Sequence, residues 1–224
     1  MNKKTIIIDT VDVAFQHCMD YVCAKEKISH PSDLEWGKGW GLVKKEWQRV
    51  ISTLNMLDCG LVLLSHETEK EIKRKHVVIN RYQPDLSKTA LEIVHNLSDI
   101  ILHLSYNEDE TRTLFATPAE DRIAGCRGGM LPEKIEPNFK AFNEAIEKST
   151  KQSYSEVLPT VLIYGAPKIG KSTIASQFPN AVFADFENGL KWLKVEKELI
   201  NNWMDFLKFC GKIKESILNN KEKI

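Results

Sequence analysis

Residues 165–172, with the sequence GAPKIGKS, constrain this chain more than any other feature. The spacing is GxxxxGK[ST], an apolar run (160–164) precedes it, and a helical pattern (171–178) follows it. A strand, a glycine-rich turn and a helix in that order place backbone N–H groups around an anion at the start of the helix. The segment therefore predicts a phosphate-binding loop within an α/β fold.

Each part of this loop has a predicted role. Its backbone is expected to hold phosphate oxygens, Lys171 to reach the β- and γ-phosphates, and Ser172 to ligate Mg²⁺. The alternative, a chance glycine turn, does not account for the correct context on both sides. The predicted nucleotide contacts are Gly165, Ala166, Pro167, Lys168, Ile169, Gly170, Lys171, Ser172 and Thr173.

The run TIIID (5–9) is the second chemical signal. It predicts a buried strand that ends in Asp9, followed by Thr10. At the carboxyl end of a strand neighbouring the loop strand, such a carboxylate would hold Mg²⁺ through water beside Ser172. An apolar strand whose final Asp caps a helix is the common alternative, so this prediction depends on the presence of the loop.

Two further strand ends carry catalytic candidates beside Lys171. The string FADFE (183–187) offers an acid that would polarise an attacking water as general base, and we favour Glu187 over Asp185. His66 ends the apolar run 61–66, where a polar residue would lie near the γ-phosphate and sense it. The alternatives are a solvated loop acid and a histidine satisfied at a strand end.

Two groups outside these strings are weaker candidates. Arg122 and Arg127 lie in a glycine-rich segment, and Arg127 is the predicted nucleotide contact, within one chain or from a neighbouring subunit. Surface arginines often do neither. Trp36 and Trp40, with the nearby Lys38, are suited to stacking on bases beside a phosphate, although tryptophans are more often core or interface residues.

Apolar runs and helical patterns alternate along the chain, which predicts a mainly parallel sheet covered by helices on both faces. A charged segment, 67–81, is expected to include a mobile or hairpin extension, and NEDE (107–110) to turn a second hairpin. The expected strands are 5–9, 61–66, 100–106, 111–117, 160–164 and 181–185. The expected helices are 11–24, 42–56, 86–97, 138–147, 171–178 and 203–218.

Composition limits the partners and the compartment. Lys+Arg and Asp+Glu are 31 each, so the net charge is zero and any contact with nucleic acid must come from a local patch or an oligomer. The five cysteines are odd in number and lack CxxC spacing, which indicates reduced thiols and a cytoplasmic location. The apolar runs are too short for a signal peptide or a membrane span.

Together these strings resemble the phage-type AAA-domain ATPases of the RecA superfamily, relatives of the phage single-strand annealing recombinases. The resemblance implies a three-layer RecA-like core, ATP and Mg²⁺ as ligands, a phage origin, and a role in recombination or single-stranded DNA binding. It also implies that Glu187 is the catalytic acid. The matching strings are VLIYGAPKIGKST (161–173), FPN (178–180), FADFENGL (183–190), TIIIDT (5–10), WGKGW (36–40), LSH (64–66) and LSDII (97–101).

The order of these strings departs from the family pattern, in which the loop strand precedes the strand ending in Asp. Here residues 158–224 resemble the family's beginning, residues 5–147 its remainder, and the polar segment 148–157 is the expected linker. This order indicates a circularly permuted single domain over residues 1–224. Two alternatives remain: halves exchanged between two chains in a swapped homo-oligomer, or a rearranged gene product that folds without turnover.

Three functions remain in order of preference. The first is an ATPase coupled to single-stranded DNA. The second is a nucleotide-binding module with little or no hydrolysis that acts through protein partners. The third is a small-molecule kinase, which is disfavoured because no arginine-rich lid segment is present.

Overall fold

The structure is a computed structural model that describes residues 5–74 and 77–221. In the described residues ten strands form one sheet in the order β10-β9-β1-β2-β8-β4-β5-β7, with β3 paired to β2 and β6 to β4. The strands from β10 to β4 in this order are parallel. The strands are β1 Thr5–Asp9, β2 Gly60–Arg74, β3 Val77–Pro84, β4 Ile100–Tyr106, β5 Arg112–Phe115, β6 Gly125–Cys126, β7 Lys134–Ile135, β8 Thr160–Gly165, β9 Ala181–Asp185 and β10 Glu196–Leu199.

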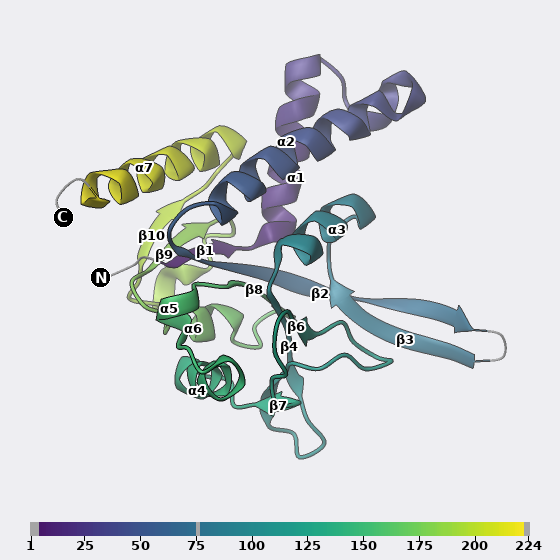
Figure 1. Cartoon of the computed structure of the whole chain (residues 1–224). Coiled ribbons are helices and arrows are strands. Elements are labelled where there is room, and N and C mark those ends of the chain that lie inside the picture. The colour runs from purple at the N-terminus through teal and green to yellow at the C-terminus, as the bar shows by residue number, and fades with distance from the viewer. Residues whose placement is uncertain (1–4, 75–76, 222–224) are drawn as a thin grey trace.

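Helices cover both faces of the sheet. Figure 1 shows α1, α2, α3 and α7 on one face and α4, α5 and α6 on the other, which makes three layers. The prediction of a mainly parallel α/β fold is confirmed. The helices are α1 Val11–Glu26, α2 Lys38–Asn55, α3 Lys88–Leu97, α4 Phe139–Thr150, α5 Tyr154–Val157, α6 Lys171–Ala175 and α7 Trp203–Lys221, with short 3₁₀ turns at Pro31–Asp33, Glu35–Gly37 and Leu190–Trp192.

Burial on both faces explains why the central strands are continuously apolar. Every residue of β1 and of β8 is buried. Because successive side chains of a strand point to opposite faces, Ile6 and Ile8 enter the core beneath α1 and α2, and Ile7 enters the core beneath α6. Packing in the two cores fixes the positions of these strands, so their carboxyl ends form a well-defined edge of the sheet.

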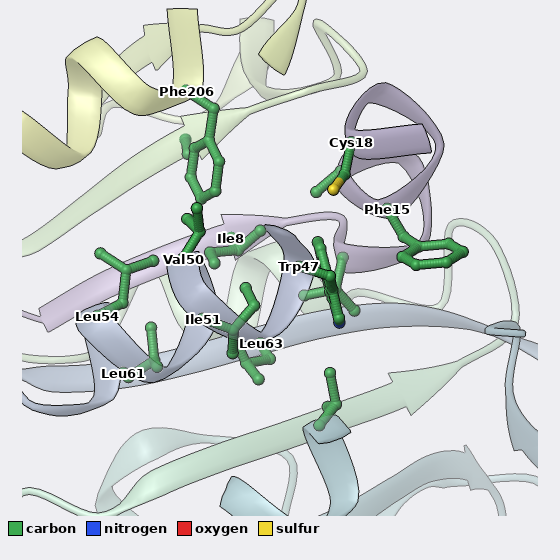
Figure 2. Packing of buried hydrophobic residues seen from close by; sticks show 14 of the residues in the cluster. Ile8, Phe15, Cys18, Trp47, Val50, Ile51, Leu54, Leu61, Leu63 and Phe206 are labelled. Atoms are coloured by element: carbon green, nitrogen blue, oxygen red, sulfur yellow. The ribbon is translucent and has the colours of Figure 1, made fainter. Parts of the chain in front are cut away.

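The larger core joins the two parts of the chain. Trp47 of α2 is fully buried, lies 5.3 Å from Phe15 of α1 between ring centroids, and lies 5.9 Å from Trp203 of α7. Figure 2 shows Trp47 among the side chains of α1, α2 and the sheet, with Phe206 of α7 above them. In the sheet, β9 and β8 from the later part of the chain flank β1 and β2 from the earlier part. The two parts thus share one sheet and one core.

The polar segment 148–157 packs against the smaller core of the protein. It includes the end of α4 and the single-turn helix α5, in which Tyr154 is fully buried. The Tyr154 ring lies 5.1 Å from Phe178 and 5.8 Å from Phe139 between centroids. This connection is therefore anchored in the smaller core.

Strand β2 is longer than the sequence indicates. It continues past His66 to Arg74 and pairs with β3 in an antiparallel ribbon that projects from the body in Figure 1. We call residues 67–74 and 77–84 the arm. The expected hairpin in the charged segment is present, and its first strand is a direct extension of a central strand.

Candidate nucleotide-binding site

The predicted site residues gather at the carboxyl edge of the parallel strands. The phosphate-binding loop follows β8, His66 lies on β2, Asp9 ends β1, and Glu187 comes two residues after the end of β9. The order β9-β1-β2-β8 brings these four positions together. One detail differs from expectation: β1 does not neighbour β8, because β2 lies between them.

The loop requires two of its glycines. A Cβ on Gly165 would collide with the Leu104 carbonyl oxygen of β4, so the loop packs against the adjacent strand. Gly170 has φ +106°, a backbone conformation that favours glycine. Lys171 follows at the start of α6 and is buried; its Nζ donates to the carbonyl oxygens of Gly165 at 2.8 Å and Ala166 at 2.9 Å. Burial lowers the pKa of the Lys171 ammonium, and a bound anion would relieve that cost.

Ser172 and Asp9 are in direct contact although they are far apart in sequence. The Ser172 hydroxyl donates to Asp9 Oδ2 at 2.7 Å. Burial, partly offset by this bond, raises the pKa of Asp9 to about 6. Glu187 and Asp185 raise it further through their negative charge, while Lys171 lowers it. A cation here would therefore relieve an unfavourable concentration of carboxylates.

Glu187 faces the same space. Its Oε1 lies 3.5 Å from the Thr10 hydroxyl, which donates to it, and 3.7 Å from Nδ1 of His66. The side chain of Glu187 is 37% exposed, so water reaches it. Asp185, by contrast, is buried and accepts hydrogen bonds from the backbone N–H groups of Gly189 and Leu190. Asp185 stabilises the turn that follows β9, and Glu187 is the acid that is accessible to a ligand.

A cavity of about 270 Å³ lies between these elements. Four predicted loop residues, Gly165, Ala166, Pro167 and Ile169, do not line this cavity. Gly165 and Ala166 contact Lys171 through their carbonyl oxygens, and Ile169 accepts from Arg112. Among the predicted residues, the cavity is lined by Asp9, His66, Lys168, Gly170, Lys171, Ser172, Thr173 and Glu187.

Arg127 does not reach this cavity. Its guanidinium bonds to Asp99 at 3.4 Å and to the Asn96 carbonyl oxygen at 2.7 Å. Asp99 precedes β4, so Arg127 lies at the amino edge of the strands, opposite the loop. Within one chain, the predicted nucleotide contact by Arg127 is therefore wrong. Arg122 is also occupied elsewhere, over the Phe115 ring at 4.2 Å.

Two residues that sequence reasoning missed lie at the site. Arg112 of β5 donates to the Ile169 carbonyl oxygen at 3.2 Å and braces the loop from outside. Trp192 lines the cavity and is 95% exposed. No motif marks either position. The only signal for Trp192 was a large aromatic a few residues after the FADFE string. Trp36 is 92% exposed and Trp40 is 39% exposed, so neither is a core residue.

The donor set fits the expected ligands. Backbone N–H groups and Lys171 suit phosphate oxygens, and the hydroxyl of Ser172 beside the carboxylate of Asp9 offers the oxygen ligands that Mg²⁺ prefers. Fold and site together define a P-loop nucleotide-binding protein.

The family comparison agrees with this class. The family described as AAA domain matches residues 2–128 and 159–223, well over half of the chain. The chain belongs to this family of P-loop ATPases. No curated protein and no solved structure shows significant similarity to it. None of the helices in the described parts of the chain has the length and apolar character needed to cross a membrane.

Proposed function

We propose that this protein is an ATP-binding, Mg²⁺-dependent ATPase of the RecA-like class, acting in a reducing cytoplasm. The observation that carries the proposal is the contact between Ser172 and Asp9, which joins the phosphate-binding loop to a second strand at 2.7 Å. Free thiols at all five cysteines support the compartment. ATP and water are the substrates, and ADP and inorganic phosphate are the products.

Each site residue has a separate role in the proposed reaction. Lys171 leaves the two loop carbonyl oxygens and contacts the β- and γ-phosphates, while the loop N–H groups hold the phosphate oxygens. Ser172 and Asp9 would hold Mg²⁺, which when bound would offset the charge of the phosphates. Glu187 orients and deprotonates the attacking water, and His66 contacts the terminal phosphate.

The alternative is a nucleotide-binding module with little or no hydrolysis that acts through protein partners. The accessible carboxylate of Glu187 favours turnover, because a general base must reach water. A small-molecule kinase ranks below both. Water reaches Glu187, and a water molecule at this acid would compete with any other acceptor of the phosphoryl group.

The test is ATP hydrolysis with Mg²⁺, measured with and without single-stranded DNA. We expect Lys171→Ala to abolish turnover, because the phosphates lose their buried cation, and the exposed Lys140→Ala of α4 to match wild type. If wild type hydrolysed ATP no faster than Lys171→Ala, the proposed ATPase activity would be refuted. If that protein still bound ATP, the alternative of a nucleotide-binding module would be supported. Turnover indifferent to DNA would remove only the link to DNA.

The link to single-stranded DNA, to recombination and to phages rests on the resemblance of the sequence strings. Because the net charge is zero, contact with DNA requires a local patch. The arm offers one: Lys70 and Arg81 are directly opposite each other in the β2–β3 register. Like charges in such a pair disfavour the ribbon, and a bound polyanion would relieve the repulsion.

We further propose that the chain is a circular permutation of its family's order. The family matches as two segments that leave out residues 129–158, and this connection includes the segment expected as a linker. A homo-oligomer, swapped or simple, is a separate proposal that solution mass at several concentrations tests.

A further inference from the structure

Asp12 stands behind the site and contacts one of its residues twice. It lies in the first turn of α1, three residues after Asp9. Its Oδ2 is 2.7 Å from Nδ1 of His66, and its Oδ1 accepts the backbone N–H of His66 at 3.2 Å. The carboxylate is largely shielded from solvent, with 13% of the side chain exposed. A shielded, two-point contact fixes both the main chain and the ring of the histidine.

The rest of the His66 main chain is also held. Its carbonyl oxygen accepts from the Asp85 backbone N–H at 2.8 Å and from the Ser65 hydroxyl at 2.9 Å. Asp85 follows the arm, so this is the point at which β2 leaves the central sheet. With both backbone groups bonded, ring rotation is the freedom that remains, and the bond to Asp12 removes it.

This bond determines which ring nitrogen meets a ligand. Nδ1 is engaged by Asp12, whereas Nε2 bonds to nothing among the described residues and is not a buried atom. His66 lines the cavity together with Lys171 and Glu187. Nε2 is therefore the nitrogen open to a bound nucleotide.

We infer that Asp12 is a positioning residue that holds His66 with Nε2 toward the terminal phosphate and so makes the site favour a triphosphate over a diphosphate. The inference rests on the proposed function, which supplies the nucleotide. Asp12 does not line the cavity formed by the described residues; within the site its hydrogen bonds go to His66, while its charge also acts on Lys171.

The charges around the ring support this role. Asp12 from α1, Glu187 from the segment after β9 and Lys171 from α6 face His66. The bond from Asp12, aided by the negative charge of Glu187, raises the pKa of His66 despite burial and Lys171. The pKa of Asp12 is pushed up by burial, but the bonds from His66 outweigh this effect and leave it lowered. The imidazolium thus persists to higher pH, and its Nε2–H can donate to a phosphate oxygen.

The test compares Mg²⁺-ADP with a Mg²⁺-bound β,γ-imido analogue of ATP by calorimetry. We expect Asp12→Asn to reduce the preference for the triphosphate by roughly tenfold, the effect of losing one hydrogen bond to a charged group, with ADP affinity unchanged. In wild type the preference should fall as the pH rises through the raised pKa of His66, and in Asp12→Asn this fall should begin at lower pH. The exposed Asp20→Asn of the same helix is the matched control.

A second measurement does not depend on the variant. In wild type, ¹⁵N spectra of the imidazole should place the proton of neutral His66 on Nδ1, and the triphosphate analogue should shift Nε2 where ADP does not. An unchanged preference and pH profile in Asp12→Asn, or an Nε2 signal indifferent to the terminal phosphate, would overturn the inference. A wild type that binds neither nucleotide would instead overturn the proposed function.

Discussion

At the scale of single residues, the site holds a carboxyl group whose ionised form is disfavoured in the absence of ligand. Asp9 is buried near Glu187 and Asp185, and its pKa is raised from 3.8 to about 6. An acid whose pKa is higher when folded binds protons more tightly in the folded state. Its contribution to stability is therefore complete below pH 4 and is lost as the pH rises through about 6.

Asp9→Asn should consequently stabilise the protein when no ligand is bound. At pH 8 we expect the free energy of unfolding to rise by up to about 3 kcal/mol, and at pH 4 the difference should vanish. Urea unfolding with EDTA and no nucleotide measures this effect, with the exposed Asp20→Asn as control. A variant less stable than wild type at pH 8 would contradict the origin assigned to the raised pKa.

Trp192 is the residue best placed to contact the base of the nucleotide. It is 95% exposed yet lines the cavity, so its ring is free to stack. Stacking of a base on an aromatic ring is worth roughly 1–3 kcal/mol, so Trp192→Ala should weaken ATP binding by about tenfold or more. Trp36→Ala removes an equally exposed ring away from the cavity and should leave affinity unchanged. Equal affinity in both variants would exclude base stacking at Trp192.

At the residue level, the sequence could predict which side chains gather at the cavity where they lie in contiguous strings. The loop, Asp9, Glu187 and His66 each belong to a strand end whose character is visible locally, and the sheet order brings them together. Arg127 was misplaced because a glycine-rich segment does not reveal which edge of the sheet it follows. Arg112 and Trp192 were missed because each reaches the site from a segment without a motif.

At the scale of elements, buried strands were predictable with their bounds, whereas exposed strands were predicted without bounds or not at all. Strands 5–9 and 181–185 match β1 and β9 because both faces of these strands are covered. Strand β10, with the sequence EKEL, was missed because it is mostly exposed at the sheet edge and carries no apolar pattern. A hairpin was expected in the charged segment, but its continuity with β2 was not, since the arm is polar beyond His66.

The connection 148–157 allows a direct test of how an element that looks like a linker contributes to stability. Tyr154 is fully buried against Phe178, so Tyr154→Ala should leave a cavity and cost about 3–5 kcal/mol. Gln152→Ala in the same segment alters an exposed side chain and should cost almost nothing. Thermal unfolding measures both, and equal midpoints would mean that the connection is only a tether.

At the scale of the whole molecule, the two parts of the chain depend on each other. Strands β1 and β2 lie between β9 and β8, and α7 packs on α1 and α2 through Trp203. Neither part contains both Asp9 and Ser172, so neither forms the site alone. We expect the site to depend on the contacts between strands and not on the order in which they are translated.

A relinked chain tests that independence. It would begin at Gln152, run to Ile224, continue through a Gly-Ser linker into Met1, and end at Lys151. The new break falls between two exposed residues outside helices and strands, where breaks are tolerated, and it leaves Tyr154 in place. We expect a cooperative fold with wild-type ATP affinity, because every contact in the sheet persists. A break between Ile163 and Tyr164 cuts the buried strand β8 and should abolish folding. If both relinked chains failed, the connection 129–158 would be essential to the fold, and the proposed permutation would lose its physical basis.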